Sequence, residues 1–368
     1  MRTLIYASLA LVAFASAPTN TQAAAITPGD LVIYRVGDGS AALGTTATAV
    51  FLDEYTTGGT LVQSFAMPTT GGSALTATGN STTEGTLSLS QNGLSFVYTG
   101  YRYDVGGATP STQTYTAANR VIGTLSLAGV TDTSTSITSD GGVTTGNAIR
   151  SATTVDGTAY WVSDSSRVSY FGSGTGSSGG TVQIDARNSR QIRVNGNTVY
   201  AANGSTAITG KLQSYGTLPT GATVPTPIIS LGTADAIQGF AMFNLNNANP
   251  GGSDTIYAMS TVAGQLLKYS FNGSSWVSDG SLTSNAQDIT GVASGSSVTL
   301  YLTGTSGLQT ITDSSGFGGA LSGSISTIIS NPSNEALRGI EILVPEPSTA
   351  VLGGLGLLGL LFARRNRK

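Results

Sequence analysis

The 368-residue chain contains no cysteine and no histidine, and only a tenth of its residues are charged. Without cysteine there is no disulfide and no thiolate nucleophile, and without histidine there is no Ser-His-Asp triad. The two absences also remove the usual ligands of zinc. We therefore assign no catalytic, cofactor-binding or metal-binding residue, and we expect no cofactor and no enzymatic activity of these classes.

What the chain does contain is typical of an all-β protein. Fifty glycines and many Ser/Thr-rich turns separate short apolar segments, and a hydrophobic content of 39% is enough to build a core. The basic residues Arg2, Arg364, Arg365, Arg367 and Lys368 all lie in the terminal segments. Without them the net charge falls from −3 to −8, or to −7 if Glu346 is also removed. Such an acidic body argues against nucleic acid as a partner, because phosphate contacts need Lys and Arg.

The first 25 residues have the order of a secretory signal peptide. A charged start at Arg2 precedes an apolar run from Leu4 to Ala17, and small residues follow at Ala23, Ala24 and Ala25. Cleavage by signal peptidase after export by the Sec machinery is expected within Ala23 to Ala25, because Pro18 disfavours cleavage after Ala17. The mature body then covers residues 26–344.

Residues 345–368 form a tail of three parts. Val344, Pro345, Glu346, Pro347 and Ser348 open it, and the two prolines hold the segment extended. Residues 350–363 are uncharged and predict a short transmembrane helix of about 21 Å. Arg364, Arg365, Arg367 and Lys368 follow and would stay cytoplasmic by the positive-inside rule. A plain tail anchor is the alternative interpretation.

The order Val-Pro-Glu-Pro-Ser, apolar helix and terminal arginines resembles the sorting signal of PEP-CTERM proteins of Gram-negative bacteria. The resemblance covers only the last two dozen residues. It implies cleavage near Pro345 to Pro347 by exosortase, a membrane protease, and release to the cell surface or extracellular matrix. It also implies an association with extracellular polysaccharide, but it says nothing of the body, because sorting signals occur on unrelated domains.

A repeated phrase organises the body. Each copy reads turn, short tyrosine-bearing strand, Gly/Ser turn and second strand, which is typical of a β-hairpin. The repeated tyrosines are separated by 62, 40, 57 and 44 residues and are Tyr98, Tyr160, Tyr200, Tyr257 and Tyr301. This spacing predicts a single β-propeller of six or seven blades, with the tyrosines in the blade cores. An irregular β-sandwich or a β-solenoid is the alternative.

The ends of the body predict closure of the propeller. Residues 336–344 form an alternating strand, and residues 31–36 and 50–55 form strands near the start. Pairing the two ends removes an exposed strand edge, so we expect Ile340–Val344 in the same sheet as Leu31–Val36.

Patterns that suggest catalysis are poor. Gly176–Gly180 has the letters of a nucleophile elbow around Ser178, and Gly204 to Lys211 approximates a phosphate-binding loop, but both lack the required context. The adjacent pair Asp53 and Glu54 is expected on a solvated edge, since neighbours in a strand face opposite sides.

Two functional hypotheses remain. The first is an exported, non-enzymatic surface or matrix protein, anchored briefly in the inner membrane and then released. The second is a carboxylate-based polysaccharide hydrolase or lyase on a propeller scaffold, which needs Asp or Glu side chains converging on a cleft. The absence of catalytic motifs favours the first.

Overall fold

The computed structural model describes residues 24–249 and 252–344, and nearly all regular structure in them is β-strand. Two short 3-10 turns, η1 (Gly71–Ser73) and η2 (Pro110–Thr112), are the exceptions within this part of the chain. The strands are β1 (Leu31–Val36), β2 (Ala47–Tyr55), β3 (Leu61–Ala66), β4 (Thr76–Thr78), β5 (Ser88–Leu89), β6 (Ser95–Tyr101), β7 (Arg120–Ser126), β8 (Thr131–Asp140), β9 (Ile149–Thr154), β10 (Tyr160–Asp164), β11 (Val168–Phe171), β12 (Ser178–Asp185), β13 (Ser189–Asn195), β14 (Thr198–Asn203), β15 (Gly210–Thr217), β16 (Thr226–Ser230), β17 (Ile237–Phe243), β18 (Thr255–Ser260), β19 (Gln265–Phe271), β20 (Trp276–Thr283), β21 (Ala286–Ser294), β22 (Ser297–Gly304), β23 (Gly307–Asp313), β24 (Ser326–Ile329) and β25 (Ala336–Ile342).

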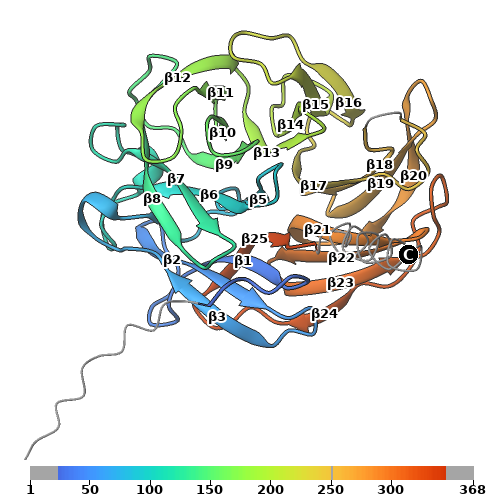
Figure 1. Cartoon of the computed structure of the whole chain (residues 1–368), viewed down its shortest axis with the longest axis horizontal. Coiled ribbons are helices and arrows are strands. Elements are labelled where there is room, and N and C mark those ends of the chain that lie inside the picture. Colours follow the sequence, from blue (N-terminus) through green and yellow to red (C-terminus); the bar gives the residue numbers. More distant parts are fainter. Residues whose placement is uncertain (1–23, 250–251, 345–368) are drawn as a thin grey trace, which may run out of the picture.

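The strands fall into six antiparallel groups of four that surround a common centre (Figure 1). The groups are β25-β1-β2-β3, β5-β6-β7-β8, β9-β10-β11-β12, β13-β14-β15-β16, β17-β18-β19-β20 and β21-β22-β23-β24. The last three are separate sheets. The first three join into one 13-stranded sheet, because β4 bridges β2 and β6, and β12 pairs in parallel with β8. No sheet of the described residues closes on itself, and the arrangement is propeller-like.

The tyrosine repeat predicted the groups correctly. The five tyrosines lie on β6, β10, β14, β18 and β22, which are the second strands of their groups. Four are buried, and Tyr200 is half-buried, so they pack as core residues rather than as exposed ligand platforms. Tyr34 takes the same place on β1, the second strand of the remaining group.

The two ends of the body share a sheet, as predicted. Strand β25 pairs with β1 so that Ile342 lies opposite Leu31 and Ile340 opposite Ile33. Thus the C-terminal strand is the inner strand of a group whose other three strands come from the start of the chain. The chain then continues through Leu343, whose backbone exchanges hydrogen bonds with Gly29 (2.7 Å) and Asp30 (3.2 Å).

Apolar side chains fill the spaces between neighbouring groups. Trp161 and Val168 of the third group pack with Ile192 and Val199 of the fourth, and all four are buried. Each fully buried Val or Ile contributes about 1.5 to 3 kcal/mol through the apolar surface it removes from water. Contacts between adjacent groups therefore hold the ring together without disulfides.

The expectation for Asp53 and Glu54 was wrong. Both are buried, because β2 lies between β1 and β3 rather than at an edge. Asp53 accepts hydrogen bonds from Arg35 Nε and Ser64 Oγ, both at 2.5 Å. Glu54 accepts from the backbone N–H of Thr27 at 2.7 Å. The pair is thus part of the packing at the N-terminal strands.

Most of the two terminal signals lies outside the described residues. This holds for the predicted signal peptide up to Ala23, and for Pro345 to Lys368 with the predicted transmembrane helix 350–363. Within residues 24–249 and 252–344 no helix is long and apolar enough to span a membrane. Ala24 and Ala25, beside the expected cleavage point, are exposed at the start of the described chain.

Candidate functional site

The innermost strands of five groups carry a β-bulge near their first residues. In β9, β13, β17, β21 and β25 the pairing register with the next strand slips at this point, so one extra residue is inserted. A bulge bends the strand and turns a side chain away from the regular alternation. In each case the inserted segment contains a long polar residue, and these are Arg150, Arg190, Gln238, Gln287 and Arg338. We call these five residues the bulge ring.

Several contacts show that the bulge ring converges on the centre of the molecule. Gln238, Gln287 and Arg338 line one small space together with Glu84 and Thr86, which precede β5. Thr86 also donates its hydroxyl to the backbone oxygen of Arg150 at 2.9 Å. The remaining group, β5-β6-β7-β8, therefore also contributes residues to the centre, although its inner strand β5 has no bulge of this kind.

Two arginines of the bulge ring are almost completely buried and only partly hydrogen-bonded. Arg338 is 3% exposed and donates Nη2 to the carbonyls of Thr78 (2.9 Å) and Gly79 (2.6 Å), whereas its Nε and Nη1 have no partner among the described residues. Arg150 is 6% exposed and binds Asn188 and the carbonyl of Ser189, but its Nε is also unpartnered. Burial lowers the pKa of both guanidinium groups.

Arg190 has fewer partners still. Its guanidinium forms no hydrogen bond or ion pair with any residue in the described part of the chain, and its Nε and Nη1 are buried. Burial, and then repulsion by Arg150, lower its pKa to about 9. The group lies against the backbone of Gly204, where a Cβ atom would come within 2.6 Å of Nε. At neutral pH the site therefore holds a half-buried positive charge that no described residue neutralises.

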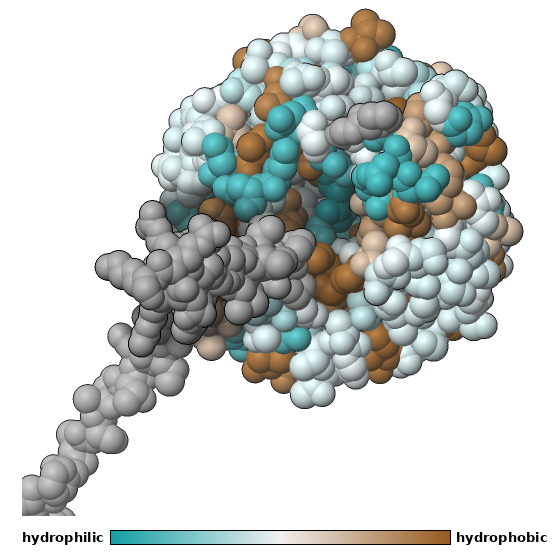
Figure 2. Space-filling model, turned by 45° about the vertical axis from the view of Figure 1, so that its right-hand side comes forward, coloured by the Kyte–Doolittle hydropathy of each residue, from teal (hydrophilic) through white to brown (hydrophobic). Residues whose placement is uncertain are grey.

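Arg190 faces a polar cavity of about 420 Å³, which is the size of a small-molecule site. Its lining is formed by hydroxyl and amide side chains with Arg190 as the charged member, and comprises Thr82, Thr83, Arg190, Thr261, Ser284, Asn285, Ala286, Gln287 and Thr305. A second cavity of about 240 Å³ adjoins it, because Thr82, Gln287 and Thr305 line both. Figure 2 shows hydrophilic side chains gathered around a hollow in one face of the molecule. We call the larger space the central cavity.

Below the bulge ring the channel is filled by Asp288 and Gln191. Asp288 accepts from Gln191 Nε2 at 2.8 Å, and it also receives the backbone N–H groups of Ile289 (2.9 Å) and Ile340 (3.3 Å). Gly239 leaves the necessary space, since a Cβ atom there would lie 2.5 Å from the Asp288 carboxylate. Burial raises the pKa of Asp288 to about 7. These contacts use both oxygen atoms of the Asp288 carboxyl group, and the two side chains fill the channel at this depth.

One layer deeper, Glu341 forms an ion pair with Arg193. Glu341 also accepts a hydrogen bond from Thr290 Oγ1 at 2.6 Å and one from the backbone of Leu89 at 3.3 Å. Glu84, Asp288 and Glu341 are therefore three carboxyl groups near the axis, as the enzyme hypothesis requires. However, all three are at most 5% exposed, and none lines the central cavity.

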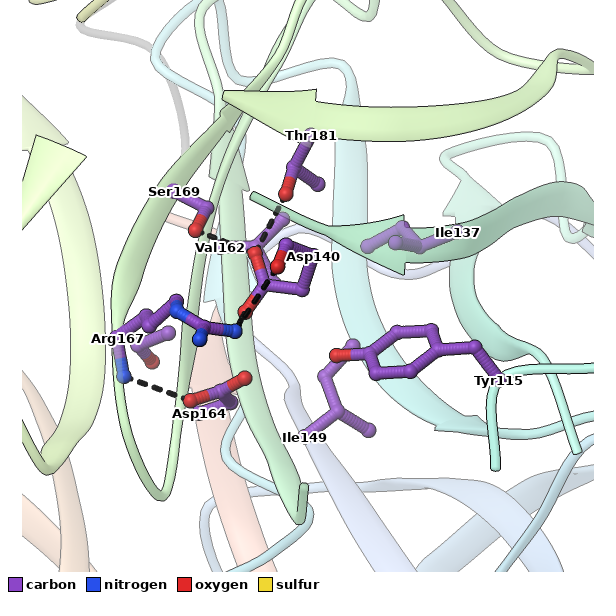
Figure 3. A pocket seen from close by; sticks show the side chains of 10 residues that line it. Tyr115, Ile137, Asp140, Ile149, Val162, Asp164, Arg167, Ser169 and Thr181 are labelled. Atoms are coloured by element: carbon purple, nitrogen blue, oxygen red, sulfur yellow. Dashed lines mark hydrogen bonds and ion pairs between the residues drawn. The ribbon is translucent and has the colours of Figure 1, made fainter. Parts of the chain in front are cut away.

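A second carboxyl pair lies away from the axis, between β8 and β10 (Figure 3). Asp140 accepts from Ser169 Oγ and Thr181 Oγ1, both at 2.5 Å, and pairs with Arg167 at 3.3 Å. Asp164 accepts the backbone N–H of Arg167 at 2.7 Å. Burial, and then the nearby Asp140, raise the pKa of Asp164 to about 8.

The space beside this pair measures only about 10 Å³, although Figure 3 shows the Tyr115 hydroxyl pointing towards it. A cavity of this size holds at most one water molecule. A glycosidase needs its two carboxyl groups on either side of a sugar bond, so this pair has no room for that reaction. We assign it to packing between the second and third groups.

Residues of the two weak sequence motifs, the Ser178 and Lys211 segments, make structural hydrogen bonds. Ser178 begins β12 and its hydroxyl bonds Ser136 at 2.9 Å. Lys211, at the end of the loop-like motif, is buried and donates Nζ to the carbonyls of Ser205 (2.6 Å) and Thr233 (2.9 Å). No cluster of three metal-ligating side chains occurs within residues 24–249 and 252–344. The bulge ring was not predicted from sequence, although the Arg or Gln at the start of each inner strand was a usable signal.

Comparisons with known proteins identify the C-terminal tail. Residues 343–368 match the model of the PEP-CTERM protein-sorting motif, so the predicted resemblance is confirmed. The motif implies an exosortase-sorted extracellular protein. No curated protein matches the chain.

Solved structures resemble the body in fold. A periplasmic gluconolactonase of Pseudomonas aeruginosa is 7% identical over 86% of this chain and 100% of its own, with a TM-score of 0.46. A chain of the nidogen–laminin complex is 11% identical over 84% and 97%, with a TM-score of 0.45. The WD40 domain of Toxoplasma gondii coronin is 11% identical over 67% and 60%, with a TM-score of 0.40. At these identities the likeness concerns the fold alone.

Proposed function

We propose that the protein is a non-enzymatic component of the cell surface or extracellular matrix, processed by signal peptidase and exosortase and associated with extracellular polysaccharide. The match of residues 343–368 to the PEP-CTERM motif carries this proposal. In this account the tail anchors the chain in the inner membrane, with its basic end in the cytoplasm, until the protease cuts near Pro345 to Pro347.

The end of the folded body suits such processing. Leu343 is buried and hydrogen-bonded to the N-terminal segment, whereas Val344 is 47% exposed. The sorting motif thus begins at the residue that follows Leu343. A protease that cuts just after Val344 would release an intact domain, because the cleavage removes none of the paired strands.

The second cavity, which adjoins the central cavity, and Leu343, after which the tail follows in sequence, lie at opposite ends of β25. Arg338, near the start of the strand, belongs to the bulge ring, and Leu343 follows its last residue. At about 3.3 Å per residue these two positions are roughly 17 Å apart. While the tail is anchored, the cavity would therefore open away from the membrane, where it is accessible to extracellular molecules.

We interpret the six groups as the blades of one six-bladed propeller, with the N- and C-terminal strands combined in the same blade. The pairing of β25 with β1 supports this interpretation. A binding role is favoured over catalysis because the open cavity is lined by hydroxyls, amides and an arginine, while Glu84, Asp288 and Glu341 are enclosed. Hydrogen-bonding side chains of this kind suit the hydroxyl groups of sugars.

Intact-mass analysis of the protein isolated from its native host tests the proposed processing. The expected mass lacks both the signal peptide, cut within Ala23 to Ala25, and the tail after a site near Pro345 to Pro347. A host strain without exosortase is the control, and there the tail should be retained. A full-length C-terminus on the surface protein of the normal host would contradict the proposal and favour a plain tail anchor.

A further inference from the structure

The bulge ring concentrates positive charge in an otherwise acidic protein. Arg150 lies near Arg190, since its Nη1 donates to the carbonyl of the adjacent Ser189 at 2.8 Å, and both Arg150 and Arg338 interact with Glu84. Glu84 is the one carboxylate that these interactions share. It forms no ion pair within 4 Å with a described arginine, and it accepts the backbone N–H of Thr78 at 3.1 Å.

Unpartnered donors at this place are costly to the folded protein. A nitrogen donor that is buried without a hydrogen-bond partner loses its hydration and gains nothing in return. Arg338 has two such nitrogen atoms, Arg190 has two and Arg150 has one. By contrast, the fully buried Lys268 has a carboxylate and three other oxygen acceptors. Outside the bulge ring Arg193 also has two such nitrogen atoms, so Arg190 is distinguished by the open cavity beside it.

The surroundings of these arginines define the kind of ligand that would satisfy them. Guanidinium groups recognise carboxylates through paired N–H donors. The rest of the central cavity offers neutral hydrogen-bonding groups, among them Thr83, Ser284, Asn285 and Gln287, which match the hydroxyl groups of a sugar. A ligand that carries a carboxylate and several hydroxyls fits both parts of the site.

We propose that the central cavity binds an acidic saccharide, with a uronic acid carboxylate on Arg190 and sugar hydroxyls on the threonine, serine and amide side chains. The inference rests on the proposed association with polysaccharide and gives that association a site and a ligand class. Arg150, which is hydrogen-bonded to Ser189, adds positive charge next to Arg190. Binding involves no covalent step.

Isothermal titration of the mature exported protein with trigalacturonate tests the proposal. Maltotriose serves as the neutral probe, and inorganic phosphate as the non-sugar anion. We expect trigalacturonate to bind, and maltotriose and phosphate to bind at least tenfold more weakly. The variant Arg190→Gln should lose about 10- to 100-fold in affinity for trigalacturonate, the usual effect of losing a hydrogen-bonded charge. Arg190→Lys keeps the charge but not the planar fork, so its affinity for trigalacturonate should lie between those of the unchanged protein and Arg190→Gln.

Arg187→Gln is the matched control, because Arg187 precedes the same strand and pairs with Asp185 at 3.3 Å outside the cavity. It removes one positive charge without touching the site, and its affinity should stay within about twofold of the unchanged protein. Equal binding of maltotriose, or equal losses in Arg187→Gln and Arg190→Gln, would overturn the proposal. Equal binding of phosphate would overturn the saccharide assignment. Failure of these titrations with normal C-terminal processing would leave the sorting role intact, so the two proposals can fail separately.

Discussion

Two cations, the fully buried Lys268 on β19 and the half-buried Arg190 on β13, show opposite ways of placing a charge inside this protein. Lys268 is fully buried and its Nζ contacts Asp313 (2.8 Å), Ser315 Oγ (2.7 Å) and two carbonyl oxygens. Arg190 has no partner among the described residues and borders a cavity of about 420 Å³. The charge of Lys268 is therefore neutralised within the protein, whereas the charge of Arg190 has no partner among the described residues.

The difference separates a structural charge from a charge available to a ligand. A buried ion pair with full hydrogen bonding is costly to break, because removal of one partner leaves the other uncompensated. Removing a charge that has no partner leaves nothing uncompensated. Mutation should therefore lower the free energy of unfolding at the Lys268 site but not at Arg190. This comparison can be made without knowing the ligand.

Asp313→Ala should cause the largest loss of stability. The substitution leaves the Lys268 ammonium buried without its carboxylate and removes the acceptor of the Tyr257 hydroxyl, now at 2.7 Å. Hydrogen bonds from Lys268 and Tyr257 hold the pKa of Asp313 low despite its burial. We expect the free energy of unfolding to fall by about 3 to 5 kcal/mol. Urea denaturation measures this, with Asp156→Ala on an exposed turn as the control. A change as small as that of the control would contradict the structural role of the pair.

Asp164→Asn should change the pH dependence of stability. The pKa of Asp164 is raised from 3.8 to about 8, so the folded protein holds a proton that the unfolded chain has lost between these values. The free energy of unfolding then falls as pH rises, by up to about 1.4 kcal/mol per pH unit from this group. Asparagine cannot ionise and keeps the acceptor for the Arg167 N–H.

We therefore expect Asp164→Asn to be more stable than the unchanged protein at pH 8 and equal or less stable at pH 4, in denaturation curves at both values. Asp288, with a pKa raised to about 7, keeps some of the slope in the variant. The carboxyl pair Asp140 and Asp164 borders no open cavity, so Asp164→Asn should not alter saccharide binding. A loss of saccharide binding in Asp164→Asn would contradict the view that the Asp140 and Asp164 pair is structural and separate from the ligand site.

Gln287→Ala should have the smallest effect on stability. Gln287 is half-buried and lines both adjoining cavities. Removing its amide should change the free energy of unfolding by no more than about 0.5 kcal/mol. Affinity for trigalacturonate should fall about 2- to 10-fold, as for the loss of one neutral hydrogen bond. Unchanged titration curves would exclude Gln287 from the binding surface and narrow the site to the arginine side.

The fold could be predicted from the sequence because its signals are local. The tyrosines recur on the second strand of each group, since that strand is buried on both faces, and turn residues separate the hairpins. The pairing of β25 with β1 followed from the need to cover two strand edges. Asp53 and Glu54 were placed wrongly because the sequence does not show that β2 is covered by β3.

The bulge ring could not be predicted in the same way, because a bulge depends on pairing register. By sequence alone Arg193 resembles Arg150, since an isoleucine precedes each of them. The slip between Ser189 and Ile192 instead places Arg190 beside Arg150 and leaves Arg193 one layer deeper with Glu341. Regular alternation does not reveal such an insertion.

The most direct test of this account is the stability of Arg190→Met in urea, with and without trigalacturonate. Without the ligand, the account predicts that the variant is at least as stable as the unchanged protein, because methionine removes a half-buried charge that has no partner among the described residues. With ligand at 100 times the Kd of the unchanged protein, the unchanged protein should gain about 2.7 kcal/mol, and a variant whose affinity falls 10- to 100-fold should gain only about 0.4 to 1.4 kcal/mol. A loss of several kcal/mol in the ligand-free variant, as expected for Asp313→Ala, would show that Arg190 is structural and would contradict the account.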